Sequence, residues 1–209
     1  MEYFAISNGI PVHILDTKKG DKTILLLHGY LETLYIYNEF IEILEKKYRV
    51  IAIDLPGHGL SGSDKEINSM EFCAQVAVDV LKKCGVEKAY VAGHSMGGYV
   101  SLAFCAAYPE RLDGLVLLSS SPNPDTELKR ENRRREIALV QAGKKDMLAR
   151  VAPEAGFAEM NRERLHKYID QLVEQVYVTD DEGIVALVGG MNERKDQNQM
   201  LGHSKVRQL

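Results

Sequence analysis

Short, continuously apolar segments alternate along this chain with longer segments whose apolar residues recur at helical spacing. The apolar segments lie at 23–28, 50–54, 89–94 and 114–120. Segments of this length are typical of strands buried on both faces, and strands that alternate with helices form a parallel sheet. The sequence therefore predicts an α/β fold with a mostly parallel central sheet and helices on both faces of that sheet.

Two further patterns complete the first half of the chain. Residues 3–6 and 11–15 flank Asn8-Gly9, a dipeptide typical of the tight turn in an antiparallel hairpin. Helical spacing also recurs between the predicted strands, where we expect helices at 37–48, 69–85 and 97–108.

The second half of the chain has a different character. Four helical patterns follow one another with no strand between them, at 126–142, 144–151, 161–178 and 180–191. We therefore divide the chain into three parts. Residues 1–121 form an α/β core, residues 122–200 form a helical cap (a lid) over the strand ends, and residues 201–209 start the next core strand.

Composition argues against several classes of function. The net charge of −4 provides no basic surface for nucleic acid or for acidic membranes. No apolar run approaches the roughly 18 residues of a membrane span, and the N-terminus has no secretory signal. The three cysteines lie in helical patterns without metal or disulfide spacing, so we expect buried thiols and a cytoplasmic location. The sequence shows no cofactor motif, and we expect neither a cofactor nor a metal.

Three unusual loops follow the predicted strands, at 28–30, 54–59 and 93–98. Parallel sheets bind ligands at the carboxyl ends of their strands, so we expect these loops to converge on one site. The third loop contains a G-x-S-x-G pattern in which Gly93 and Gly97 flank Ser95. Between a strand and a helix, this pattern makes a sharp turn that exposes the serine hydroxyl, and the glycines avoid collisions there. Ser95 is therefore the candidate nucleophile.

The segments LLLHGY, VIAIDLPGHGLS, VAGHSMGG and AAYPERLDGLVLLSS resemble the α/β-hydrolase family in their order and spacing. The resemblance runs from Tyr3 to about Leu201 and is to the small, cap-bearing serine hydrolase and esterase branch. It implies the α/β-hydrolase fold and Ser95 as the nucleophile. Serine as the nucleophile argues against family members that resemble epoxide hydrolases and haloalkane dehalogenases, because those proteins use aspartate at this position.

The resemblance also implies an oxyanion hole. Its two donors would be the backbone N–H groups of Met96, which follows the nucleophile, and of Tyr30, which follows the His28-Gly29 pair. Gly29 supports the second of these turns. Two such donors stabilise the tetrahedral oxyanion of acyl transfer, and the loss of one typically costs about 3 kcal/mol.

The other histidines near these loops are expected to be structural. The side chain of His94 should point away from the site, since neighbouring residues of a strand face opposite sides. His28 should brace the oxyanion loop. We call the three loops at the carboxyl ends of the strands (28–30, 54–59 and 93–98) the rim. His58 and Asp54 should stabilise this rim and the loop that contains Ser61.

The partners of the nucleophile are harder to assign. The family order places an acid and then a histidine after the serine. The resemblance implies that 204–209 begin the next sheet strand and that both residues lie in segments beyond it, so we expect this chain to lack the C-terminal strands and a complete triad. Within the chain, the candidates are Asp125 as the acid and His203 as the base. His166 is assigned to a helix surface.

The expected function is a serine hydrolase that acts on a small ester, thioester or related acyl compound through a Ser95 acyl-enzyme. Two alternatives remain, namely an inactive binding protein with the same fold and a lyase on the same scaffold. Without its base, the chain should turn over esters very slowly. The strand at 114–120 should lie near a sheet edge, so we also expect a homodimer through that edge unless 204–209 covers it.

Overall fold

The computed structural model describes residues 1–204 and 206–207. Its described strands form one sheet with the order β1-β2-β4-β3-β5-β6. These strands are β1 (Glu2–Ser7), β2 (Ile10–Asp16), β3 (Thr23–Leu27), β4 (Arg49–Ile53), β5 (Ala89–His94) and β6 (Leu112–Leu118). β3 pairs in parallel with β4 and β5, and β5 pairs in parallel with β6. The hairpin of β1 and β2 is antiparallel and joins β4. The predicted mostly parallel sheet is confirmed.

Helices cover both faces of the sheet, as predicted. One face packs against α2 (Met70–Lys83) and α3 (Met96–Ala107), and the opposite face packs against η1 (Leu34–Tyr37) and α1 (Asn38–Leu44). The strands alternate between the two cores: Leu25 and Leu27 of β3 join the α2/α3 side, while Leu26 joins the other. A short helix, η2 (Pro109–Arg111), leads into β6. The continuously apolar strands therefore have two buried faces.

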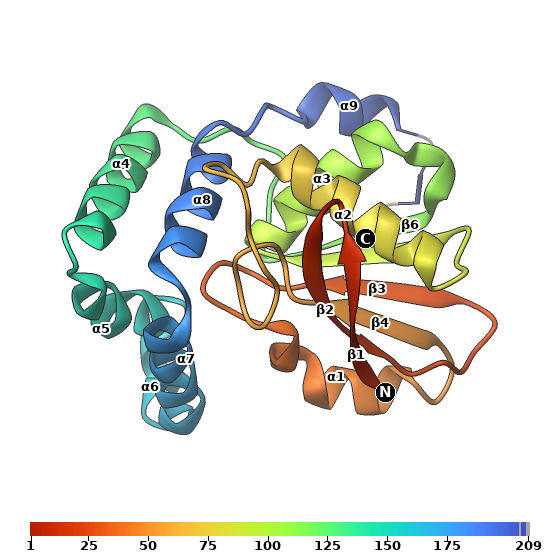
Figure 1. Cartoon of the computed structure of the whole chain (residues 1–209), viewed down its shortest axis with the longest axis horizontal. Helices are drawn as coiled ribbons and strands as arrows, with labels where there is room; N and C mark the ends of the chain where they lie inside the picture. The colour runs from red at the N-terminus through yellow and green to blue at the C-terminus, as the bar shows by residue number, and fades with distance from the viewer. Residues whose placement is uncertain (205, 208–209) are drawn as a thin grey trace.

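The remaining helices come from the second half of the chain. They are α4 (Glu127–Gln141), α5 (Lys145–Ala155), α6 (Glu159–Arg162), α7 (His166–Val178), α8 (Asp181–Asn192) and α9 (Asn198–His203). α4 packs on α8, and α5 packs on α7. In Figure 1, α4 to α7 form an outer layer, and α8 stands between that layer and the sheet.

Three expectations for this region need correction. The helix expected at 144–151 continues to Ala155, although Pro153 has no N–H to donate to the carbonyl oxygen four residues earlier. The single helix expected at 161–178 is two helices separated by a turn at 163–165, although its apolar spacing continues through the break.

The strand expected at 201–209 does not begin at 201. Residues 201–203 end α9, because the N–H of Leu201 is taken by the carbonyl oxygen of Gln197 in a helical turn. Further on, the carbonyl oxygen of Arg207 accepts a hydrogen bond from the N–H of Leu115 on β6 (2.8 Å). Residues 205, 208 and 209 of the expected strand lie outside the described residues.

Helix α8 contacts the core through glycine. A Cβ on Gly183 would overlap the carbonyl oxygen of Gly57, and a Cβ on Gly190 would overlap that of Asn68. The N–H of Asn68 also donates to the carbonyl oxygen of Ala186 (3.0 Å). The backbone of α8 therefore lies directly on the loop that follows β4.

Lys145 joins the outer helices to the start of α8. Its ammonium group donates to the carbonyl oxygen of Thr179 (2.7 Å) and lies 2.8 Å from the carboxylate of Asp181. Gly143, with φ of 70°, makes the turn between α4 and α5 two residues earlier. Lys145 thus bridges the turn before α5 and the turn before α8.

Within residues 1–204 and 206–207, no helix combines the length and the apolar character needed to cross a bilayer.

Cys73 and Cys105 are buried free thiols, and Cys84 is half-buried.

A buried ion pair lies at the end of the sheet opposite the predicted site. The guanidinium of Arg49 donates to both carboxylate oxygens of Asp16 (2.9 and 2.7 Å), and the ammonium of Lys18 lies 2.7 Å from the same carboxylate. Burial by itself would raise the pKa of Asp16, but hydrogen bonds from Arg49 and Lys18 outweigh it and lower the pKa to about 2.

Stability is therefore expected to fall in acid through Asp16. A carboxyl whose pKa is lower in the folded than in the unfolded chain stabilises the fold above the unfolded value of 3.8, and this contribution is lost as pH falls through about 2. The shift corresponds to about 2 kcal/mol. Urea unfolding between pH 5 and pH 2 should show this loss in the wild type and not in Asp16→Asn. Asp21→Asn, which changes an exposed carboxylate, is the control. If the free energy of unfolding of Asp16→Asn still falls with pH as steeply as that of the wild type, the assignment is contradicted.

Candidate active site

Ser95 lies in the turn between β5 and α3, with a backbone that few L-residues adopt (φ 49°, ψ −111°). Its N–H donates to the carbonyl oxygen of Leu118 (2.9 Å). Its own carbonyl oxygen accepts from the N–H of Gly98 (3.0 Å) and from the hydroxyl of Ser120 (2.8 Å). The side chain is half-buried. Hydrogen bonds to β6 and to the loop after it therefore hold a strained turn in place.

The glycines around Ser95 allow three chain segments to meet. A Cβ on Gly97 would overlap the carbonyl oxygen of Leu27 at the end of β3, and a Cβ on Gly93 would overlap the carbonyl oxygen of Gly97. The hydroxyl of Ser101 donates to that same oxygen (2.8 Å). The first turn of α3 thus packs directly on the backbone of two strands.

Gly97→Ala is expected to lower the free energy of unfolding by about 2 kcal/mol, because the new methyl group collides with backbone that belongs to the central strand. Gly202→Ala on α9 is the matched control, since among the described residues no atom beyond its own helical turn lies within 4 Å of the added methyl group. Urea denaturation of both variants measures the difference. Equal stability of the two variants would contradict the close packing described here.

The two amides expected to form the oxyanion hole lie on neighbouring loops. Met96 is the first residue of α3, so its N–H has no acceptor within the helix. Among the described residues, neither this N–H nor that of Tyr30 donates a hydrogen bond. The hydroxyl of Tyr30 donates to the carboxylate of Glu136 on α4 (2.5 Å). Burial, together with Glu136, raises the pKa of Tyr30 well above its usual value.

His28 joins the ends of two strands. The N–H of Leu55 donates to its Nε2 (2.9 Å), so the proton is on Nδ1, which donates to the carbonyl oxygen of Gly29 (2.7 Å). Burial lowers the pKa of His28. His58 stacks on His28 with ring centroids 5.9 Å apart, and burial, with His28 close by, lowers its pKa to about 3. Both rings are therefore neutral near pH 7 and are tied to backbone.

Asp54 holds the loop that follows β4. Its carboxylate pairs with Nδ1 of His13 (2.8 Å) and accepts from the backbone N–H groups of Leu34 (2.8 Å) and Leu60 (2.9 Å). Its carbonyl oxygen accepts from the hydroxyl of Ser61 (2.7 Å). These partners come from β2, from η1 and from the loop after β4, and Asp54 is fully buried.

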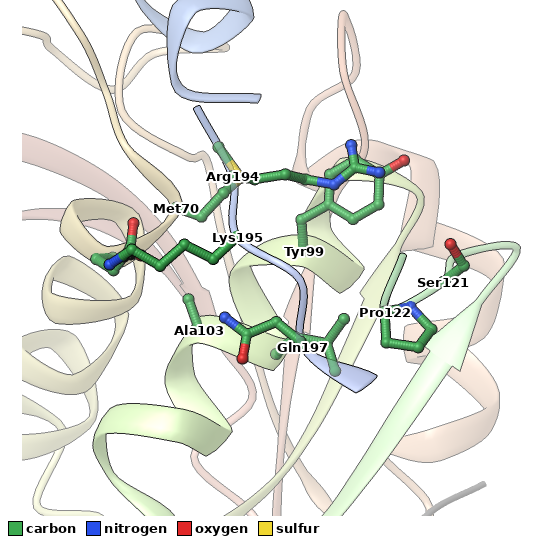
Figure 2. Close-up of a pocket in the computed structure, with 10 residues that line it drawn as sticks. Met70, Tyr99, Ala103, Ser121, Pro122, Arg194, Lys195 and Gln197 are labelled. Atoms are coloured by element: carbon green, nitrogen blue, oxygen red, sulfur yellow. Dashed lines mark ion pairs between the residues drawn. The ribbon is translucent and has the colours of Figure 1, made fainter. Parts of the chain in front are cut away.

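Asp125 lies beyond β6 between two arginines. Its carboxylate accepts from Nε of Arg133 on α4 and from Nη1 of Arg194 after α8, each at 2.5 Å. Burial by itself would raise the pKa of Asp125, but the two guanidinium groups outweigh it and lower the pKa. The guanidinium of Arg194 lies 3.9 Å from the ring centroid of Tyr99, and Figure 2 shows its side chain running across that ring.

His203 and His166 are exposed at helix ends. Nδ1 of His203 bonds to the carbonyl oxygen of Gln199 (2.7 Å), and Nδ1 of His166 bonds to that of Glu163 (2.9 Å). In the part of the chain that the structure describes, no hydrogen bond joins Ser95 to a histidine. The structure thus brings Ser95, Tyr30 and Met96 to one rim, whereas Asp125 and His203 have other partners.

Two hollows lie near this rim. A small one of about 10 Å³, room for a single water, lies beside Tyr99, Pro122 and Arg194 (Figure 2). A wider groove of about 840 Å³ is lined by the loop at 57–66, the end of α4 and the start of α8. Ser95 lines neither of them.

Sequence analysis missed Glu32 and Glu136, two acidic residues of this rim. Glu32 follows the His28-Gly29 pair closely, and its carboxylate accepts from the N–H of Gly29 (2.6 Å). That short spacing is a signal that could have identified it. Glu136 is 106 residues from Tyr30 along the chain, and no local pattern connects the two.

A model of the alpha/beta hydrolase fold matches residues 22–157. Over 103 residues the chain is 35% identical to the uncharacterized hydrolase YugF of Bacillus subtilis (strain 168), a match that covers 49% of this chain and 38% of that protein. Over 117 residues it is 38% identical to a 2-hydroxy-6-oxononadienedioate/2-hydroxy-6-oxononatrienedioate hydrolase of Paraburkholderia phymatum, covering 51% and 39%. The chain therefore spans less than half the length of these curated relatives.

Solved structures match the whole chain. A thermophilic esterase from Thermogutta terrifontis superposes with a TM-score of 0.91 and 27% identity, covering 100% of this chain and 78% of that one. The enol-lactonase from Burkholderia xenovorans LB400 superposes with a TM-score of 0.90 and 20% identity, covering 99% and 79%, which shows a shared fold. Because the family model matches more than half of its residues, the chain belongs to the alpha/beta hydrolase fold family.

Proposed function

We propose that this protein is a serine hydrolase that acts on a small ester, thioester or related acyl compound. The observation that carries the proposal is the strained turn at Ser95, which has a positive φ and lies between a central strand and a helix. Strained backbone of this kind is retained where the surrounding structure enforces it, and it is common at active sites. The curated relatives described above are named as hydrolases.

In the proposed reaction, the Ser95 hydroxyl attacks the acyl carbonyl carbon and a tetrahedral oxyanion forms. The N–H groups of Tyr30 and Met96 bind that oxygen, since neither has another partner among the described residues. Collapse of the intermediate breaks the bond to the leaving group, which departs as the alcohol or thiol with the proton of the Ser95 hydroxyl and leaves an acyl group on Ser95. Water then attacks this acyl group, releases the carboxylic acid and restores the Ser95 hydroxyl.

The base of the reaction is left unassigned. A serine without an adjacent base is a weak nucleophile at neutral pH, and no histidine of the described part is bonded to Ser95. We therefore propose that the 209-residue chain hydrolyses esters slowly. We also propose that the helices from α4 to α8 form a cap over the acyl group. The residual rate would come from attack by Ser95 without a base, assisted by the two amides, because oxyanion stabilisation persists when a triad is incomplete.

The test is reaction with a fluorophosphonate followed by intact mass and peptide mapping. Wild type should gain one adduct, located on Ser95, and Ser95→Ala should gain none. Ser119→Ala, which removes an exposed hydroxyl from the same rim, is the matched control and should react like wild type. A folded wild type that stays unlabelled at Ser95 would favour the binding-protein alternative. Aryl esters of increasing acyl length then define the substrate.

A further inference from the structure

Glu32 connects the two loops that carry the proposed oxyanion donors. It lies in the loop between β3 and η1, and its Oε2 accepts from the N–H of Gly29 (2.6 Å) and lies 2.9 Å from Nδ1 of His94. A carboxylate only accepts hydrogen bonds, so Nδ1 of His94 carries the proton and donates it. His94 directly precedes Ser95. The Glu32–His94 pair therefore spans from the Tyr30 loop to the Ser95 turn.

The Glu32–His94 pair is partly buried. The side chain of Glu32 is 15% exposed and that of His94 is 33% exposed, so water screens the pair only in part. The hydrogen bond that His94 donates to Glu32 raises the pKa of His94. The other titratable groups beside the pair are His28, which is buried and neutral, and Tyr37, whose hydroxyl donates to the carbonyl oxygen of Leu27 (2.8 Å). Glu32 is thus the acceptor that fixes the His94 ring.

Both polar groups of Gly29 are held by side chains. Glu32 binds its N–H, and Nδ1 of His28 donates to its carbonyl oxygen (2.7 Å). That carbonyl and the N–H of Tyr30 belong to the same planar peptide unit and point in opposite directions. When the carbonyl of Gly29 is held, the direction of the Tyr30 N–H is held with it.

The backbone of this loop needs such support. Leu31 has φ of 60°, a left-handed conformation that costs a residue with a side chain about 1–2 kcal/mol. A Cβ on Gly29 would lie 2.6 Å from Oε2 of Glu32 and 2.9 Å from Nδ1 of His94, so the pair packs directly on the Gly29 backbone. A side chain at residue 29 would push the carboxylate or the imidazole out of its present position.

We propose that Glu32 is a positioning residue whose carboxylate, bonded to His94, sets the distance between the amides of Tyr30 and Met96. The role rests on the proposed function, because it is the oxyanion of acyl transfer that the two amides would bind. Glu32 itself touches no reacting atom. Its effect reaches the reaction through the Gly29 peptide unit on one side and the Ser95 turn on the other.

The kinetic test compares Glu32→Ala, Glu32→Gln and the control Glu42→Ala, which removes an exposed carboxylate from α1. Glu32→Ala should lower the maximal rate of Ser95 labelling by a fluorophosphonate about 10²-fold, the usual effect of losing one oxyanion donor. The probe concentration at half-saturation should not change. Glu32→Gln keeps an oxygen for the Gly29 N–H and should recover most of the rate. If Ser95 in Glu32→Ala is labelled at the wild-type rate, the proposal is overturned.

A second measurement does not depend on catalysis. Amide hydrogen exchange of Gly29 should be faster in Glu32→Ala than in wild type and Glu42→Ala, and the pKa of His94 followed by NMR should fall in Glu32→Ala. If wild-type Ser95 is not labelled, the proposed function fails. Glu32 is then judged by exchange alone, and unchanged exchange of Gly29 overturns its role. If Glu32→Ala does not fold, His94→Ala removes the same connection from its other end and should slow labelling too.

Discussion

Ser95→Ala is expected to lower ester hydrolysis about 10³-fold or more, because a nucleophile cannot be replaced by the groups that surround it. In a well-studied serine protease with a complete triad, loss of the nucleophile alone costs about 10⁶-fold, and the smaller effect expected here reflects a Ser95 that no described histidine activates. The measurement is the initial rate with short-chain aryl esters at high protein concentration, with circular dichroism to show that the variant is folded. Ala fits the Ser95 backbone as well as Ser does, so stability should change little.

The Ser119→Ala control should hydrolyse at the wild-type rate. A Ser95→Ala variant that keeps more than a tenth of the wild-type rate would show that another group attacks the ester. The serine mechanism would then have to be given up, although the family assignment would stand.

Asp125→Ala is expected to lower the free energy of unfolding by about 3 kcal/mol. The side chain of Asp125 is fully buried and is bonded to Arg133 and Arg194, so its removal leaves two largely buried guanidinium groups without their counter-charge. Asp113→Ala, which removes an exposed carboxylate from β6, is the matched control and should stay within about 0.5 kcal/mol of wild type. Urea denaturation of the three proteins measures the difference.

The same variant separates two roles for Asp125. If it holds the segment after α8 on α3, stability falls, and ester hydrolysis falls only as far as folded protein is lost. If it is the acid of a triad, hydrolysis per folded molecule falls while stability changes little. The arginine partners lead us to expect the first result.

The sheet could be predicted well because its signal is local. A buried strand such as β3 needs only four consecutive apolar residues, Ile24 to Leu27, and those residues also show that both of its faces are covered. The Ser95 turn is equally local, since Gly93 and Gly97 lie within two residues of the serine. The break between α6 and α7 was missed because the apolar spacing continues across it.

The polar contacts of the rim could not be predicted in the same way. Glu32 and His94 are 62 residues apart, and Asp125 and Arg194 are 69 residues apart. Such pairs depend on which loops meet at the carboxyl edge of the sheet, and that is decided by strand order. A single sequence suggests that Asp125 follows β6, but it gives no indication that two arginines reach it from α4 and from the end of α8.

The contacts of α8 limit how access to the rim can change. Gly183 and Gly190 lie so close to the backbone of Gly57 and Asn68 that α8 cannot slide or rotate without separating from the core. An opening motion of the outer helices must therefore bend at the turns before α5 and before α8, since a few connecting residues can absorb such a change. Lys145 bridges those two turns. Any bend that parts these two turns must therefore break the contacts of Lys145 with Thr179 and Asp181.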